Sequence, residues 1–125
     1  MCWLSKEKPI KKVTIEDKTV YKLLTPDLRA PFKPFRYYYN EKQIEEELKI
    51  RTRYDFNYKK SIFEITKGYH SYSKESVISK MKQINEIWIG KYLRIFVCII
   101  PKGSIYYENS DCEVVSSNIV IKKEL

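Results

Sequence analysis

Two adjacent apolar runs near the end of the printed chain constrain its fold more than any other feature. Residues 92–100 are mostly β-branched and aromatic, the short segment 101–104 (Pro-Lys-Gly-Ser) interrupts them, and a similar run resumes at Ile105. An apolar run, a turn segment with proline and glycine, and a second run predict a buried strand, a tight turn and another strand. The rest of the chain is therefore expected to pair with these two strands or to pack on them.

The same residue types predict further strands. Each segment is short, rich in Val, Ile, Thr, Tyr or Phe, and bounded by turn-forming or charged residues. These segments lie at residues 19–24, 35–39, 51–58, 61–66, 113–115 and 118–121. Residues 67–68 are expected to turn the chain into 69–72. Residues 41–50 are left open between helix and strand, because Ile44 and Leu48 fit helical spacing but the next segment alternates as a strand does.

One main helix is predicted from residue 74 to about 86. Val77, Met81 and Ile84 recur at helical spacing with Ile78 beside them, and Ser73 precedes them as a candidate amino-terminal cap. One helix among six to eight strands predicts an α+β domain. Its sheet is expected to be mostly antiparallel, and either curled or a partly open barrel.

The chain length and its charge suggest a simple organisation. At 125 residues the chain can bury one core. We expect a basic amino-terminal arm over residues 1–18 and a single domain over 19–125. Residues 1–60 hold fifteen Lys or Arg against nine Asp or Glu, whereas residues 61–125 hold nine against seven. A basic half indicates an anionic partner such as nucleic acid, a nucleotide or an acidic protein, and ordinary solubility explains the charge equally well.

Cysteine and histidine usage argues against several classes of site. Cys2, Cys98 and Cys112 are odd in number and far apart, and His70 is the only histidine. A disulfide framework or a zinc site is therefore not expected, and a reducing compartment fits better. No stretch has the length of a membrane span and no signal-peptide pattern opens the sequence, so we expect a cytoplasmic protein with no membrane partner, metal or cofactor.

Two turn segments carry candidate ligand-binding residues. His70 and Ser71 precede the predicted helix, whose free N–H groups would suit a phosphate. Lys102, Ser104 and Tyr106 lie in and after the turn at 101–104. If the helix and the long strand run antiparallel, His70 and Lys102 would lie on the same side of the domain, within about two side-chain lengths. The alternative is structural: a helix start and a plain hairpin loop.

A third candidate is a run in which cations alternate with flat rings. It includes Arg29, Arg36, Tyr38, Arg51 and Arg53. Platforms that stack nucleic-acid bases use this chemistry, with arginine binding phosphates and rings binding bases. Strands with an aromatic core face and a charged outer face produce the same pattern, so both interpretations stay open.

Several segments in order resemble a known group of proteins. Val20-Tyr21-Lys22, then residues 68–72 (Gly-Tyr-His-Ser-Tyr), then residues 98–107 and 115–121 are similar to small uncharacterised proteins encoded by phages and mobile elements, which often begin Met-Cys. The resemblance covers most of the chain. It implies a phage context, and hence the host cytoplasm, but no activity.

Ser71-Tyr72-Ser73 also resembles the middle motif of the ADP-ribosyltransferase fold, and Glu113 is similar to its late glutamate. That resemblance implies that these residues surround NAD together with a residue of the first strand. The first strand here offers Tyr21-Lys22 where the family has arginine or histidine, and the S-x-S segment directly precedes a helix, which are departures from the family pattern.

The sequence as a whole favours a binding module over an enzyme. The expected ligand is anionic, either a nucleotide-type signal or nucleic acid, and the expected role is counter-defence by a phage. The alternatives are an NAD-using transferase and an inhibitor whose Tyr- and Arg-rich face binds a host defence protein. Self-association stays open. The candidate ligand-binding residues are Arg29, Arg36, Tyr38, Arg51, Arg53, His70, Ser71, Lys102, Ser104 and Tyr106.

Overall fold

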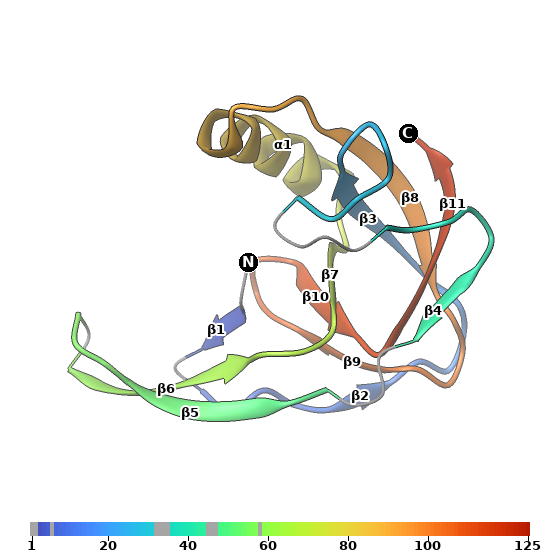
Figure 1. Ribbon diagram of the computed structural model, residues 1–125. Helices are drawn as coiled ribbons and strands as arrows, with labels where there is room; N and C mark the ends of the chain where they lie inside the picture. The colour runs from blue at the N-terminus through green and yellow to red at the C-terminus, as the bar shows by residue number, and fades with distance from the viewer. Residues whose placement is uncertain (1–2, 6, 32–35, 45–47, 58) are drawn as a thin grey trace.

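The computed structural model describes residues 3–5, 7–31, 36–44, 48–57 and 59–125 (Figure 1). In these residues one helix accompanies eleven strands, which form two sheets. In chain order the elements are β1 (Trp3–Ser5), β2 (Lys12–Val13), β3 (Lys18–Leu24), β4 (Lys42–Ile44), β5 (Ile50–Asp55), β6 (Lys60–Ile65), β7 (Tyr69–Tyr72), α1 (Glu75–Ile89), β8 (Arg94–Ile100), β9 (Ile105–Glu108), β10 (Glu113–Ser116) and β11 (Asn118–Glu124).

The larger sheet is built around the long apolar strand near the end of the chain. Its order is β2-β9-β10-β7-β3-β8-β11-β4, and each neighbouring pair is antiparallel. β8 pairs with β3 along its whole length, from Ile100 opposite Lys18 to Arg94 opposite Leu24. The sheet curls without closing into a barrel (Figure 1). The predicted α+β class, with a mostly antiparallel curled sheet and one main helix, is confirmed.

Two core clusters cover the two faces of this sheet. On one face, alternate residues of β3 and β8 are fully buried, including Val20, Leu24 and Phe96. On the other face, Ile78 of α1 packs with Leu23 and Leu93. β8 therefore has fully buried side chains on one face and half-buried ones, such as Ile95, on the other, which is why its sequence is a nearly continuous apolar run.

The helix differs from its prediction at both ends. Ser73 does not cap it: Lys74 is the residue at the N-cap position and its side chain makes no cap hydrogen bond, whereas the Ser73 hydroxyl donates to Oε2 of Glu108 at 2.9 Å. The helix also runs past residue 86 to Ile89, where Gly90 in the left-handed conformation ends it (φ 69°).

The buried side of α1 is also rotated from the predicted stripe. Ile78 and Asn85 are buried, but Ile84 is 39% exposed. Asn85 tolerates burial because its side-chain amide donates to the Met81 carbonyl oxygen at 2.8 Å. The predicted stripe was built from apolar residues at helical spacing, so it included Ile84 and not the polar Asn85.

The segment predicted as a strand at 35–39 is not one within the described residues 36–39. Arg36 and Tyr39 make only isolated bridges, to Arg29 and Ile121. Tyr37 is buried, and its backbone N–H donates to the Leu28 carbonyl oxygen at 2.8 Å. Tyr37 therefore packs into the core as the anchor of a loop, and the aromatic residues do not mark a strand. Phe35 lies outside the described residues.

Residues 41–50 contain two extended pieces and no described helix. Lys42–Ile44 forms β4 at the edge of the larger sheet, antiparallel to β11, and Ile50 begins β5. Residues 69–72, expected only to follow a turn, form β7 between β10 and β3. The strands predicted at 19–24, 51–58, 61–66, 105–107, 113–115 and 118–121 are present as β3, β5, β6, β9, β10 and β11, with ends shifted by a few residues.

The second sheet has three strands in the order β1-β6-β5. β5 and β6 form an antiparallel hairpin that extends away from the larger sheet at the lower left of Figure 1. β1, from the predicted arm, pairs with β6, and β2, from the same arm, pairs with β9. Strand pairing thus ties residues 3–5 and 12–13 to the two sheets.

Candidate functional site

Two short segments hold nearly all of the net charge. Residues 6–12 and 49–60 contain nine Lys or Arg against two acidic residues, a difference of seven, in a chain whose net charge is +8. Strand pairing brings them to one end, because β1 pairs with β6 and β6 pairs with β5. We call this the basic end. Its described cations are exposed and comprise Lys8, Lys11, Lys12, Lys49, Arg51, Arg53, Lys59 and Lys60.

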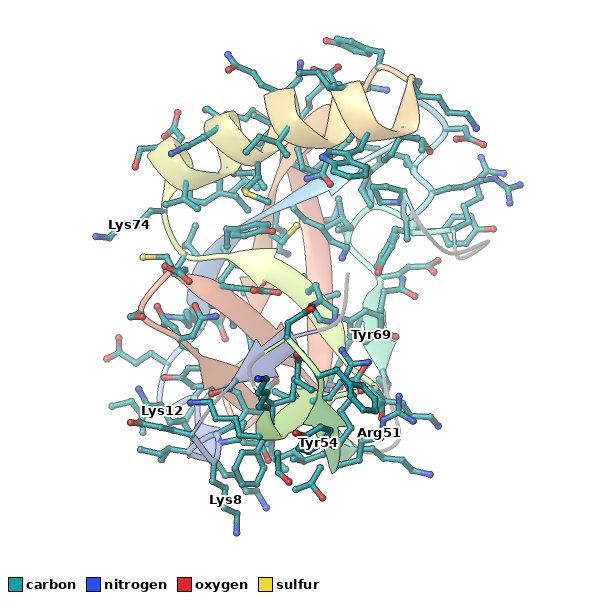
Figure 2. The ribbon with its side chains drawn as sticks, turned by 90° about the vertical axis from the view of Figure 1, so that its left-hand side faces the viewer. Lys8, Lys12, Arg51, Tyr54, Tyr69 and Lys74 are labelled. Atoms are coloured by element: carbon teal, nitrogen blue, oxygen red, sulfur yellow. The ribbon has the colours of Figure 1, made fainter. Side chains whose placement is uncertain are left out.

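Figure 2 gives the placement of the basic end in the molecule. Lys8, Lys12, Arg51 and Tyr54 lie at the lower end, opposite α1, whereas Lys74 lies near the beginning of α1. The residues outside the two segments hold fifteen Lys or Arg against fourteen acidic residues. The two segments of the basic end therefore carry a large net positive charge, whereas the rest of the sequence taken together is almost neutral.

Alternation along β5 puts two of the predicted site residues side by side. Arg51 and Arg53 share a face of the strand, because side chains of a strand alternate between its faces. Nε of Arg51 lies 2.9 Å, and Nε of Arg53 3.7 Å, from Oε2 of Glu64 in β6. The Glu64 side chain is 5% exposed, whereas those of the arginines are 62% and 47% exposed. Two guanidinium groups share one carboxylate, so the cluster keeps a positive charge.

The tip of the β5–β6 hairpin presents aromatic rings to solvent. Phe56 is 84% and Tyr54 52% exposed, and the two rings meet edge to face with their centroids 5.1 Å apart. The turn is held by Asp55, whose Oδ1 accepts a hydrogen bond from the Asn57 backbone N–H at 2.8 Å. A cluster of cations and flat rings thus occupies a fixed, accessible position.

His70 and Ser71 lie in β7, which follows β6 after Gly68. His70 is half-buried with Nδ1 3.4 Å from Oε1 of Glu113, and burial lowers the pKa of the imidazole below 6.5 while the Glu113 hydrogen bond opposes that shift. Tyr72 is also half-buried, and burial together with Glu113 raises its pKa to about 12. Ser71 is fully buried, and among the described residues its hydroxyl has no hydrogen-bond partner.

The predicted residues of the β8–β9 turn have mainly structural contacts. The Lys102 backbone N–H donates to Oδ1 of Asp17 at 2.9 Å, and its side chain is exposed. Ser104 is buried and its hydroxyl donates to the Pro101 carbonyl oxygen at 2.6 Å. Tyr106 is half-buried with the Lys18 ammonium 5.5 Å from its ring centroid.

The strand register does not support a shared site for His70 and Lys102. Tyr72 lies opposite Tyr21, so His70 lies level with Leu23, whereas Ile100 lies opposite Lys18. Five residues of β3 separate these rows, about 16 Å at about 3.3 Å per residue. Lys102 lies beyond the farther row, so His70 and Lys102 do not lie level with each other along β3. Tyr106, by contrast, lies in one row with Ser116 and Tyr69 across β9, β10 and β7.

The remaining predicted residues lie in the segment between β3 and β4. Nε of Arg29 lies 2.8 Å from Oδ2 of Asp27, and the Arg36 guanidinium carbon lies 5.6 Å from the Tyr38 ring centroid. Tyr38 is 50% exposed. A backbone bridge joins Arg29 to Arg36, whose guanidinium lies near Tyr38. Arg51 and Arg53 contact Glu64, and no described contact joins this pair to Arg29 and Arg36.

Register and alternation divide the residues of the transferase resemblance between two faces. Tyr21, Tyr72 and Glu113 lie opposite one another on β3, β7 and β10, whereas Lys22 and Ser71 face the other side. Lys22 alternates with Val20 and Leu24, and Ser71 with Tyr69, so both face the core that these apolar residues form. Glu113 precedes Val114, which belongs to that same core, and therefore faces the other side of the sheet. Lys22 is itself engaged, since its ammonium donates to the His70 carbonyl oxygen at 2.7 Å. Lys22 and Ser71 therefore do not converge with Glu113, which shares its face with Tyr72.

Sequence reasoning missed most of the basic end. Lys8, Lys12, Phe56, Lys59 and Lys60 were not among the predicted site residues. The signal that identifies them is the high density of positive charge in residues 6–12 and 49–60. Comparing residues 1–60 with 61–125 averages this density over a longer stretch and so hides it.

Comparisons with family models, curated proteins and solved structures find no match to this chain. In the part of the chain that the structure describes, no helix is long and apolar enough to cross a membrane. Within the same residues, no group of three or more His, Cys, Asp and Glu side chains could hold a metal ion. Cys98 and Cys112 are free thiols, and burial raises the pKa of Cys98 to about 12, so this thiol stays protonated at neutral pH.

Proposed function

We propose that this protein is a non-catalytic binding module that captures nucleic acid through its basic end. The observation that carries the proposal is the concentration of charge. Residues 6–12 and 49–60 hold seven of the eight net positive charges, and Lys8, Lys12 and Arg51 lie at the same end of the molecule (Figure 2). Lysine and arginine clusters that neutralise phosphates supply most of the affinity of such modules.

A long polyanion suits this surface better than a small nucleotide. Nucleotides are usually held in enclosed sites by a few convergent polar groups. Here the cations are exposed and distributed over a hairpin and the chain beside it, and the arginines of the β3–β4 segment are separate. Successive phosphates of a strand can meet such distributed charges, whereas one nucleotide cannot.

The biological setting follows the resemblance to phage-encoded proteins. It supports a role in counter-defence in the host cytoplasm, in which capture of a nucleic acid would withhold it from a host defence protein. The proposal of nucleic-acid capture itself rests on the basic end and stands without this setting.

Binding of a labelled oligonucleotide at low salt tests the proposal. The double variant Arg51→Ala/Arg53→Ala should lose affinity by about tenfold, because two phosphate contacts disappear. The matched control Arg29→Ala/Arg36→Ala removes two arginines outside the basic end and should change affinity by less than about twofold. Equal losses in both variants would contradict the proposed surface.

A second variant guards against a folding artefact. Removing both arginines leaves the buried Glu64 with fewer cationic partners, which costs stability. Lys59→Ala/Lys60→Ala removes two exposed cations of the same hairpin and should weaken binding without lowering the melting temperature. If neither this variant nor the arginine variant binds more weakly than the unmodified protein, nucleic-acid capture by the basic end is wrong.

A further inference from the structure

The tip of the β5–β6 hairpin carries an aromatic residue whose exposure has no structural explanation in the fold. Phe56 is 84% exposed, although Gly, Asn and Asp are the usual residues of tight turns. It lies outside the three core clusters of the described residues. The fold therefore gains no core packing from this ring, which stays accessible to a ligand.

Several contacts restrict the described residues of the tip. Asp55 accepts the Asn57 backbone N–H, Asp55 lies opposite Lys60 in the strand register, and Lys59 adopts a left-handed backbone conformation with φ 52°. These constraints restrict the backbone next to Phe56. Binding through a restrained segment loses less conformational entropy than binding through a mobile loop.

The ring arrangement leaves aromatic surface free. In an edge-to-face pair, one ring contributes an edge and keeps both faces, and the other keeps one face outside the pair. The exposures of Phe56 and Tyr54, 84% and 52%, agree with open ring faces. Flat rings with open faces beside exposed cations match a ligand that carries flat rings and phosphates together.

We propose that Phe56, with Tyr54 beside it, stacks on unpaired bases, so that the ligand of the basic end is single-stranded nucleic acid. This inference rests on the proposed function, because the cations Arg51, Arg53, Lys59 and Lys60 bind the phosphates on either side of the stacked base. In a duplex the base faces are covered by their neighbours, so stacking selects a single strand. Base faces are common to all four bases, and little sequence preference is expected.

Three probes separate stacking from charge. The first is a labelled oligothymidylate of about 12 nucleotides, within the usual site sizes of such modules. The second is a duplex of the same length, and the third is heparin, a polyanion without bases. Phe56→Ala should weaken binding of the single strand by about tenfold, in the range measured for one stacked base, and should change duplex and heparin affinity by less than about twofold.

Two further variants complete the experiment. Phe56→Trp keeps a stacking ring and should restore single-strand affinity. Trp88→Ala removes an equally exposed aromatic residue of α1, 82% exposed, and should leave all three affinities unchanged.

The outcomes distinguish this inference from the function on which it rests. If Arg51→Ala/Arg53→Ala weakens all three probes but Phe56→Ala weakens none, the basic end captures polyanions and base stacking is wrong. Equal weakening of single strand, duplex and heparin by Phe56→Ala would also overturn stacking. If no probe binds at low salt, both the inference and the proposed function fail.

Discussion

Nε of Arg51 lies 2.9 Å from Oε2 of Glu64, and the two residues lie directly opposite each other on β5 and β6. The carboxylate is almost fully buried while the guanidinium reaches solvent. Glu64 therefore has two opposed effects: it stabilises the hairpin, and it neutralises part of the charge that would attract a polyanion.

Glu64→Gln should consequently bind nucleic acid more tightly and fold less stably. Loss of the negative charge frees both Arg51 and Arg53 for phosphates, and a few-fold gain in affinity at low salt is expected. Loss of charge-assisted hydrogen bonds should lower the free energy of unfolding by about 1–2 kcal/mol. Oligonucleotide titration and urea denaturation measure the two effects. Glu41→Gln, at an exposed carboxylate, is the control, and a weaker-binding Glu64→Gln would contradict the role assigned to this carboxylate.

Gly68 joins β6 to β7 at a point with no room for a side chain. A Cβ there would lie 2.4 Å from Cγ1 of Val115 and 2.6 Å from Cδ2 of Leu48, and its φ of +133° disfavours other residues. Gly68→Ala should therefore lower the free energy of unfolding by about 2 kcal/mol or more through overpacking and backbone strain.

Gly103→Ala is the matched control for this change. Its φ is +86°, but a Cβ would meet nothing within 4 Å, so only the backbone strain applies. Thermal denaturation of the two variants gives the comparison. Equal losses of stability would show that crowding at Gly68 is not the cause.

His70 should make stability depend on pH in a narrow window. Burial lowers its pKa below the unfolded value of 6.5, so the folded protein binds fewer protons there than the unfolded chain. The stability is fully present above pH 6.5 and is lost as pH falls from 6.5 towards the folded pKa. Since His70 is the only histidine, His70→Asn should flatten the melting temperature between about pH 7.5 and 5.5. An unchanged slope in the variant would refute this assignment.

The local sequence pattern predicted the fold better than it predicted the candidate site. β3 and β8 could be predicted because their apolar residues pair along the whole length of both strands. The burial of Phe96 and Cys98 on one face follows from the alternation of side chains along a strand. The aromatic run at 35–39 led to a wrong strand prediction for its described residues, since Tyr37 is buried while Tyr38 and Tyr39 are exposed. Aromatic content is common to strands and to loop anchors, so it does not separate them.

The basic end could not be predicted from local pattern. Arg51 and Arg53 were identified from their alternation with aromatic residues, but Lys8 and Lys12 lie near them only because β1 pairs with β6 and β2 pairs with β9, in each case across some sixty residues or more of the chain. Phe56 was missed because an aromatic residue in a strand-like segment is usually a core residue. Its exposure depends on the hairpin extending beyond the larger sheet.

The most direct test of nucleic-acid capture is a residue-level map of the bound surface. Amide resonances of the isotope-labelled protein would be followed during titration with a short oligothymidylate at low salt. The account predicts that the largest shifts fall in residues 7–12 and 49–60, with little change in α1, in β7 or in residues 25–31. Shifts centred on His70 or on Arg29, or no shifts at saturating oligonucleotide, would contradict it.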